Sequence, residues 1–194
     1  MLDHLVERMR AGGAEELVVV TRPEKHDVSE RAGALGARVL EVRTRTVTES
    51  IEAGLEGLAQ DTVVLLGFPD TIWEPADGFR LLVERVAAGA EVVLGLFRTP
   101  DLRRSDVVRF YDQGGVAGIA VKPTQPPSDW IWGCAAARRS ALEGLAREPD
   151  PGRHFDALAG LGLVEGVQLS DRWLDIGTKE ALEQLQPDAE AAVR

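Results

Sequence analysis

Apolar residues recur along the first half of the chain with two alternating periods. Leu2, Leu5, Val6 and Met9 lie at positions i, i+3, i+4 and i+7, which is the spacing of one face of a helix. Short apolar runs, which are typical of buried strands, alternate with further stretches of helical spacing. These patterns predict strands at 16–20, 38–42, 62–67 and 91–97, and helices at 2–9, about 28–35, 51 to about 58, and from Pro75 to before Gly89.

This alternation predicts an α/β protein with a mostly parallel mixed sheet and crossover helices, arranged as a Rossmann-like fold of three layers. The run 62–67 is nearly all apolar, as expected for a central strand that is buried on both faces. Thr48 or Ser50 is expected to cap the helix that starts at Ile51. The opening helix is unusual, because its apolar face has no strand before it.

The second half of the chain has a different pattern. Two apolar runs flank Asp112-Gln113-Gly114-Gly115, which predicts a hairpin. Prolines then mark an irregular segment, a strand is expected at 130–136, and two helices precede a strand near 164–169. Thr178 is expected to cap a last helix at 179–185. One domain therefore covers 1–186, and the polar, Ala-rich tail at 187–194 is expected to fray.

Composition and charge narrow the function classes. The 194 residues include 22 Lys and Arg against 32 Asp and Glu, a formal net charge of −10, which opposes general binding to nucleic acid or to anionic lipid. One cysteine excludes a disulfide framework within the chain. No apolar run is long enough to span a membrane, and the first ten residues do not form a signal peptide. A cytoplasmic protein is expected, with a homo-oligomer left open.

Three residues are candidates for chemistry, two of them at predicted strand ends. Asp70 follows the buried run 62–67, and ligands bind at this edge in open α/β sheets. Asp175 lies between apolar residues and two residues before Gly177, and two isolated carboxylates suffice for Mg²⁺. Lys122 ends a strand before a proline and suits a phosphate. Each also has a structural alternative: a turn cap for Asp70, a loop contact for Asp175 and a solvated side chain for Lys122.

Taken in order, these segments resemble the sugar-1-phosphate nucleotidylyltransferase family. The segments are 1–9 and 13–20, which resemble an internal helix and the next strand; 67–75, the family's Asp-bearing metal segment; 119–123, its Glu-Lys-Pro strand, followed by Trp132-Gly133; and 173–178, its Trp-x-Asp-x-Gly-Thr segment. The last is the most specific, and the resemblance covers nearly the whole chain.

The resemblance implies a nucleotide-diphospho-sugar transferase type of fold and a Mg²⁺-dependent reaction. A nucleoside triphosphate and a sugar 1-phosphate would give a nucleotide sugar and pyrophosphate. Asp70 and Asp175 would hold Mg²⁺, Lys122 would meet the sugar phosphate, and Gly133 would let the sugar approach the backbone. Asp70 and Lys122 are thus the expected catalytic residues. Substrate binding is expected at Gly133, Trp132, Thr71 and Thr48.

The chain also departs from the family. No counterpart of the Gly-rich phosphate loop occurs in the 194 residues, the family's Glu before the Lys is Val121, and 46–50 replaces the Pro-x-Gly base segment. Three hypotheses stay open: a longer native protein carries the loop before Met1; the protein is a degenerate homologue that binds a sugar nucleotide or a partner subunit without catalysis; or it is another nucleotide-dependent α/β enzyme such as a glycosyltransferase. Without the loop, little or no pyrophosphate release is expected.

The remaining chemically versatile residues favour structural roles. The three histidines show no metal-ligand spacing. Cys134 has no basic neighbour in the sequence and is expected to be a small core residue.

Overall fold

The computed structural model describes residues 1–99, 102–170 and 173–175, the last three for the backbone only. The elements, in chain order, are α1 (Leu2–Ala11), β1 (Val18–Thr21), α2 (His26–Ala34), β2 (Arg38–Glu41), α3 (Val47–Gly54), β3 (Val63–Gly67), β4 (Thr71–Trp73), α4 (Gly78–Ala87), β5 (Val92–Arg98), β6 (Val107–Phe110), β7 (Val116–Ala120), β8 (Trp130–Arg138), the 3₁₀ turns η1 (Arg139–Leu142) and η2 (Leu145–Arg147), α5 (Pro151–Gly160), β9 (Val164–Ser170) and β10 (Trp173–Asp175).

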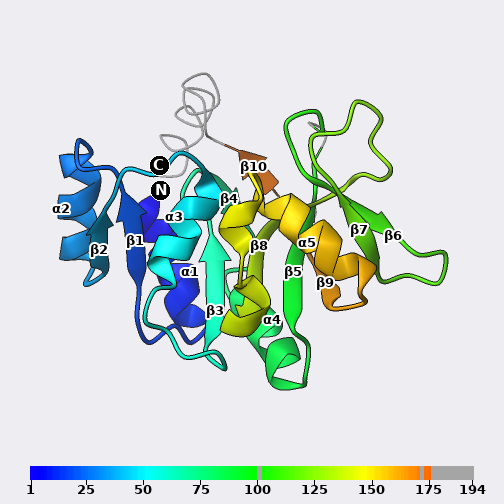
Figure 1. Ribbon diagram of the computed structural model, residues 1–194, viewed down its shortest axis with the longest axis horizontal. Coiled ribbons are helices and arrows are strands. Elements are labelled where there is room, and N and C mark those ends of the chain that lie inside the picture. The colour runs from blue at the N-terminus through cyan, green and yellow to red at the C-terminus, as the bar shows by residue number, and fades with distance from the viewer. Residues whose placement is uncertain (100–101, 171–172, 176–194) are drawn as a thin grey trace, which may run out of the picture.

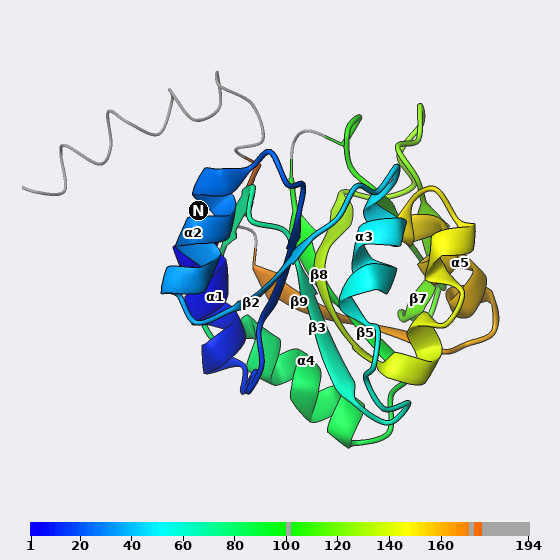
Figure 2. The ribbon, with the colours of Figure 1, turned by 60° about the vertical axis from the view of Figure 1, so that its left-hand side comes forward.

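The main sheet has six strands and is mixed, as the sequence predicts, but its described pairs are mostly antiparallel rather than mostly parallel. Its order is β7-β6-β8-β5-β9, with β3 paired to β8. Strands β3, β5, β6 and β9 run in one direction and β7 and β8 in the other. Because β8 lies between β3 and β5 (Figures 1 and 2), β5–β9 is the one parallel pair among the described strands of this sheet.

Side chains of β5 divide between two apolar cores, which gives the three layers. Val92, Leu94 and Leu96 face the core that α3 and α5 cover, whereas Val93 and Phe97 face the core beneath α1 and α4. Successive residues of a strand point to opposite faces, so a continuous apolar run fills both cores. The three-layer α/β arrangement is confirmed.

Strand β3 is less buried than its apolar sequence predicts. Its side chains are mostly half-buried, and Val63 is 39% exposed. β3 pairs with β8 on one side, while β1 and β2 form a separate parallel pair. Within the described residues no strand is hydrogen-bonded to the other edge of β3, and this leaves the strand more open than a central strand.

Helix α1 covers the end of β3, which explains its apolar face. A Cβ atom on Gly67 would lie 2.6 Å from Leu5 Cδ1 and 3.0 Å from Met9 Cε, and a Cβ on Gly12 would lie 2.5 Å from Phe79 Cβ of α4. The opening helix therefore packs on β3 and α4 and needs no strand before it along the chain to bury its apolar residues.

Three local expectations need correction. Helix α3 begins at Val47, not Ile51, because the Thr46 hydroxyl accepts a hydrogen bond from the Glu49 amide at 3.1 Å and caps the helix. Helix α4 begins at Gly78 and not at Pro75, because Pro75 lies in the turn before it, where its carbonyl accepts a hydrogen bond from the Gly78 amide at 3.1 Å. Strand β4 was not expected, because a strand of three residues is too short to show an alternation of apolar and polar positions.

The hairpin over Val107–Ala120 is confirmed, with the Tyr111 amide donating to the Gly115 carbonyl at 3.1 Å. The helix expected at 179–185 and the tail at 187–194 lie outside the described residues. In the described part of the chain, no helix has the length and apolar character needed to cross a membrane.

Candidate functional site

The backbone brings two acidic residues near each other where β3 ends. Asp70 lies exposed in the turn between β3 and β4, and the Thr71 hydroxyl fixes that turn by donating to the Phe68 carbonyl at 2.9 Å. Strand β10 pairs antiparallel with β4, with Asp175 opposite Thr71. The backbone thus brings Asp175 beside Asp70, as the metal hypothesis requires. The Asp175 side chain lies outside the described residues.

Helix α1 anchors this strand pair. Arg8 is buried, and its guanidinium donates to the Trp73 carbonyl from Nε at 3.0 Å and from Nη2 at 2.6 Å. The same guanidinium lies over the Trp73 ring, 5.3 Å from its centroid. A charged donor pair on one buried carbonyl is among the stronger hydrogen-bond arrangements. Arg8 therefore fixes the end of β4 and, through it, the turn that carries Asp70.

Trp132 lies close to the same edge. Its ring packs edge-to-face on Phe68 and Phe155, with centroids 5.8 and 5.1 Å apart. Gly133, the next residue, is buried and falls at a β-bulge, because Cys134 pairs with Gly95 and Trp132 with Leu96. Bulges occur often beside active sites, where they re-aim a side chain. Through Phe68, Trp132 is connected to the turn that carries Asp70.

Lys122 follows β7 in an unusual backbone conformation. Its φ is +42°, the left-handed region that a side chain rarely adopts. Its ammonium Nζ lies 3.3 Å from Oδ1 of Asp150, the N-cap residue of α5. Such strain persists where the surrounding structure imposes it, and it is common at binding sites. Both side chains are accessible enough to meet a ligand.

Asp106, just before β6, was missed by the sequence analysis. Burial raises the pKa of its carboxyl group, while the nearby Lys122 charge and the Trp132 side chain oppose that rise. The Trp132 amide donates to the Asp106 carbonyl at 3.4 Å, so the two residues are adjacent. A single Asp before a strand matches no motif, so the sequence alone did not single it out. The one hint in the sequence was indirect: Val121 replaces the acid that the resembled family has before its lysine.

The predicted substrate residue Thr48 has a different environment. It is fully buried, and its hydroxyl donates to the Glu148 carbonyl at 2.6 Å, which ties α3 to the segment before α5. An open pocket of about 390 Å³ lies beside the same helix start, at the ends of β1 and β2. Its polar lining comes from Thr21, Arg22, Lys25, Thr44, Arg45, Thr46 and Ser50. Thr48 is not among the residues that line it.

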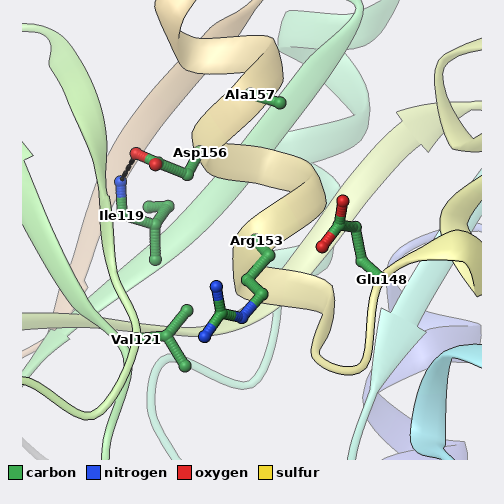
Figure 3. Close-up of a pocket in the computed structure, with 6 residues that line it drawn as sticks. All are labelled: Ile119, Val121, Glu148, Arg153, Asp156 and Ala157. Carbon is green, nitrogen blue, oxygen red and sulfur yellow. Dashed lines mark hydrogen bonds between the residues drawn. The ribbon is translucent and has the colours of Figure 1, made fainter.

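A second pocket, also of about 390 Å³, lies between β7 and α5 (Figure 3). Asp156 Oδ1 accepts from the Ile119 amide at 2.8 Å and from Arg109 Nη2 at 2.7 Å, so it holds α5 against β7. The Arg153 side chain extends toward Val121, with Glu148 across the pocket. This packing sets the start of α5 beside Lys122.

The other candidates have structural roles. Cys134 is completely buried, and burial raises the pKa of its thiol, which confirms the expected core position. His154 Nε2 lies 2.8 Å from the Ala141 carbonyl. No group of three or more His, Cys, Asp or Glu in the described residues is placed to hold a metal ion.

Several solved structures have a similar fold. A structure assigned as a glucose-1-phosphate thymidylyltransferase from Bacillus anthracis, in complex with a sucrose, superposes with a TM-score of 0.77 at 16% identity, over 94% of this chain and 79% of that one. A UDP-glucose pyrophosphorylase complexed with UDP-glucose gives 0.80 at 14% identity, over 100% and 87%. The chain has the fold of the sugar-phosphate nucleotidyltransferases.

A UDP-glucose pyrophosphorylase without ligand gives a TM-score of 0.78 at 11% identity, again over 100% of this chain and 87% of that one. No protein-family model matches the sequence, and no curated protein matches it. The nucleotide-diphospho-sugar transferase type of fold, expected from the resemblance, is confirmed. At these identities the likeness extends to the fold and not to individual site residues.

The acidic pair fits a magnesium ion in donor chemistry. Mg²⁺ takes one or two carboxylates and leaves its other positions to water and phosphate oxygens. Asp70 is exposed at the strand edge, and Asp175 lies opposite its neighbour Thr71. Directly opposed residues of antiparallel strands have Cα atoms about 4.5–5.5 Å apart. The pairing therefore brings the Asp175 backbone close to Thr71, the residue that follows Asp70.

Proposed function

We propose that this chain carries the active site of a Mg²⁺-dependent nucleotidylyltransferase. Its substrates would be a nucleoside triphosphate and a sugar 1-phosphate, and its products a nucleotide sugar and pyrophosphate. The observation that carries the proposal is the β4–β10 pairing, which sets Asp175 opposite Thr71, the residue after Asp70, at the edge where β3 ends. The fold of the solved structures described above supports the same reaction class.

The chemistry demands that two anions approach each other. A phosphate oxygen of the sugar 1-phosphate attacks the α-phosphorus of the triphosphate, the bond to the β-phosphate oxygen breaks, and pyrophosphate leaves. Catalysis of such transfers is mostly positioning and charge neutralisation. Mg²⁺, when held by Asp70 and Asp175, would supply neutralising charge for the phosphate oxygens.

The chain's own residues would divide the remaining work. Lys122 would bind the sugar phosphate, exchanging its contact with Asp150 for the ligand. Trp132 and Phe68 would form an apolar wall that limits water near the reacting groups. The pocket beside α3 offers hydroxyl and basic side chains, which suit the nucleotide.

A second candidate is a homologue that binds a sugar nucleotide or a partner subunit without catalysis. Val121 favours it, because it removes the acid that the family has before its lysine. The absence of a Gly-rich phosphate loop among the 194 residues favours it as well. In the described part of the chain, the edge of β3 away from β8 has no strand paired to it that could present such a loop.

A substrate panel tests the proposal. Each nucleoside triphosphate is combined with several hexose 1-phosphates, with and without Mg²⁺, and pyrophosphate release is measured. The same panel is run on the protein extended by any in-frame residues that its gene encodes before Met1. Release that needs both substrates and Mg²⁺ supports the transferase. Calorimetric binding of a sugar nucleotide without release in either form favours the second candidate.

A further inference from the structure

The buried guanidinium of Arg8 has two acceptors. Its Nε and Nη2 atoms donate to the Trp73 carbonyl, and its Nη1 atom lies 2.9 Å from Nδ1 of His4, one helical turn earlier in α1. A guanidinium only donates hydrogen bonds, so Nδ1 is the acceptor and carries no proton. The ring hydrogen of His4 is therefore on Nε2, and His4 must be neutral to make this contact.

The surroundings of His4 favour its neutral form. Its Nε2 atom is buried, and within the described residues that atom has no hydrogen-bond partner. Burial lowers the pKa of the His4 ring, and the Arg8 charge lowers it further. His4 also lies in the first turn of α1, where the helix dipole disfavours a positive charge. A second cation beside Arg8 is thus unfavourable.

Other charged groups face this pair from three elements: the Met1 amino group, Asp3 and Glu7 on α1, Arg31 on α2, and Glu74 on β4. Glu7 favours a charged His4 ring and the Met1 amino group opposes it, but the Arg8 charge acts on the ring more strongly than either. Arg31 is held by its ion pair with Asp3. The charge of Arg8 therefore dominates among those that act on His4.

Protonation of His4 would remove its contact with Arg8. With both ring nitrogens protonated, Nδ1–H would face Nη1–H of Arg8, which sets donor against donor and cation against cation. Arg8 links α1 to the end of β4 through the Trp73 carbonyl, and Trp73 is paired with Trp173, two residues before Asp175. The added proton would therefore weaken the anchor of the strand pair that carries the site.

We propose that His4 is a proton-operated latch between α1 and the β4–β10 pair. The neutral ring accepts a hydrogen bond from Arg8 and holds the guanidinium on the Trp73 carbonyl. When the ring gains a proton from solvent, the latch opens and the site loses affinity for Mg²⁺. The latch rests on the hydrogen bonds of Arg8, and only its effect on Mg²⁺ rests on the proposed function.

Nuclear magnetic resonance of the side chains tests the latch without turnover. The Arg8 Nε–H signal, assigned by its loss in Arg8→Lys, reports hydrogen exchange at the bond to Trp73 between about pH 5 and 8. His4→Asn keeps an acceptor near the position of Nδ1, does not titrate and has a similar helix propensity. His4→Leu has no acceptor at any pH. His26→Asn, at an exposed position in α2, is the matched control.

Exchange in each protein is divided by exchange in His4→Asn at the same pH, which removes the general rise of exchange with pH. The unsubstituted protein should match His4→Asn at the high end and exchange about fivefold faster once His4 is protonated, since one hydrogen bond is lost. This change should follow the ring titration of His4, with a midpoint below the ordinary value of about 6.5. His4→Leu should exchange faster at every pH, and His26→Asn should follow the unsubstituted protein.

Three results would overturn the latch: a His4 ring that titrates at or above about 6.5, Arg8 exchange that stays unchanged relative to His4→Asn while His4 titrates, or equal exchange in His4→Leu and His4→Asn. The last result would mean that the His4 ring only fills space.

Mg²⁺ titrations at both ends of the pH range test the link to the site. Mg²⁺ should lower the midpoint of the His4 titration, because a proton that weakens Mg²⁺ binding is itself bound less tightly when Mg²⁺ is present. Mg²⁺ binding that leaves this midpoint unchanged would overturn the link. A latch that responds to pH in a protein that binds no Mg²⁺ would leave the latch standing and refute the metal site.

Discussion

Asp175 lies opposite Thr71 in the antiparallel β4–β10 pair, and Thr71 directly follows Asp70. The pairing joins the last described strand to the turn after β3, so the site depends on two distant parts of the chain. Arg8 of α1 holds the other end of β4 through the Trp73 carbonyl. Packed elements therefore hold the backbone around Asp70 and Asp175 in place.

The first prediction concerns this acidic pair. Asp70→Asn and Asp175→Asn should each lower Mg²⁺-dependent pyrophosphate release by about 100-fold or more, because each removes a negative charge and an oxygen ligand of the ion. The form of the protein that turns over in the substrate panel is used, and circular dichroism checks that the fold is kept. Asp112→Asn serves as the control. Undiminished release in either variant would refute the metal assignment.

The second prediction concerns Lys122. Lys122→Ala should raise the KM for sugar 1-phosphate by about 10-fold or more, since a charge-assisted contact to phosphate is lost. The KM for the triphosphate should change much less. Lys122→Arg keeps the charge and should recover part of the affinity. Initial rates over a range of sugar 1-phosphate concentrations give the answer, and an unchanged dependence would remove Lys122 from the site.

Local patterns allowed much of the fold to be predicted. The hairpin around 112–115 and the helix–strand order of the first half follow from periodicity and turn residues, which act over a few positions. The placement of β8 between β3 and β5 does not, because it depends on Cys134 pairing with both Gly67 and Gly95. Pairings between residues this far apart in the chain leave no trace in a local sequence pattern.

The same limit applies to the site. Asp70, Lys122 and Asp175 could be proposed from the sequence because each lies in or directly after a recognisable segment. Asp106 and its neighbour Trp132 are brought together by the pairing of β6 and β8, which no local pattern reveals. Thr48 was predicted to bind substrate because it lies in a polar segment at a helix start. In the structure its hydroxyl donates to the Glu148 carbonyl.

The third prediction concerns the packing of α1 on α4. Gly12→Ala should lower the free energy of unfolding by about 1–3 kcal/mol, because its Cβ would lie 2.5 Å from Phe79 Cβ, which cannot swing away like a flexible side-chain end. Gly33→Ala in α2 is the matched control: nothing lies within 4 Å of its Cβ, and helix propensity favours alanine by about 0.5–1 kcal/mol. Urea unfolding compares the two. Equal stabilities would contradict the close α1–α4 contact.

The fourth prediction concerns Thr48. Thr48→Val should cost about 1–3 kcal/mol of unfolding free energy, because the part-buried Glu148 carbonyl loses the donor that the buried Thr48 supplies. Thr48→Ser retains the hydroxyl and should cost less. If Thr48 also contacts substrate, Thr48→Val will raise a KM at temperatures where the protein is fully folded. An unchanged KM beside a lowered stability would limit Thr48 to its structural role.

The last prediction concerns the pH dependence that Asp106 creates. Burial raises the pKa of its carboxyl group in the folded state, so the folded protein holds this proton more tightly than the unfolded chain. The stability that the proton contributes is fully present below the unfolded-state pKa of about 3.9 and is lost as pH rises through the folded-state pKa. Asn at the same position does not titrate.

The free energy of unfolding of Asp106→Asn, relative to that of the unsubstituted protein, should therefore increase as pH rises through that window and then level off. Urea unfolding at several pH values measures this difference in unfolding free energy. The contributions of Lys122, Asp150 and the other titrating groups are nearly the same in both proteins, so they largely cancel. A difference that is constant with pH, or that falls, would contradict the raised pKa.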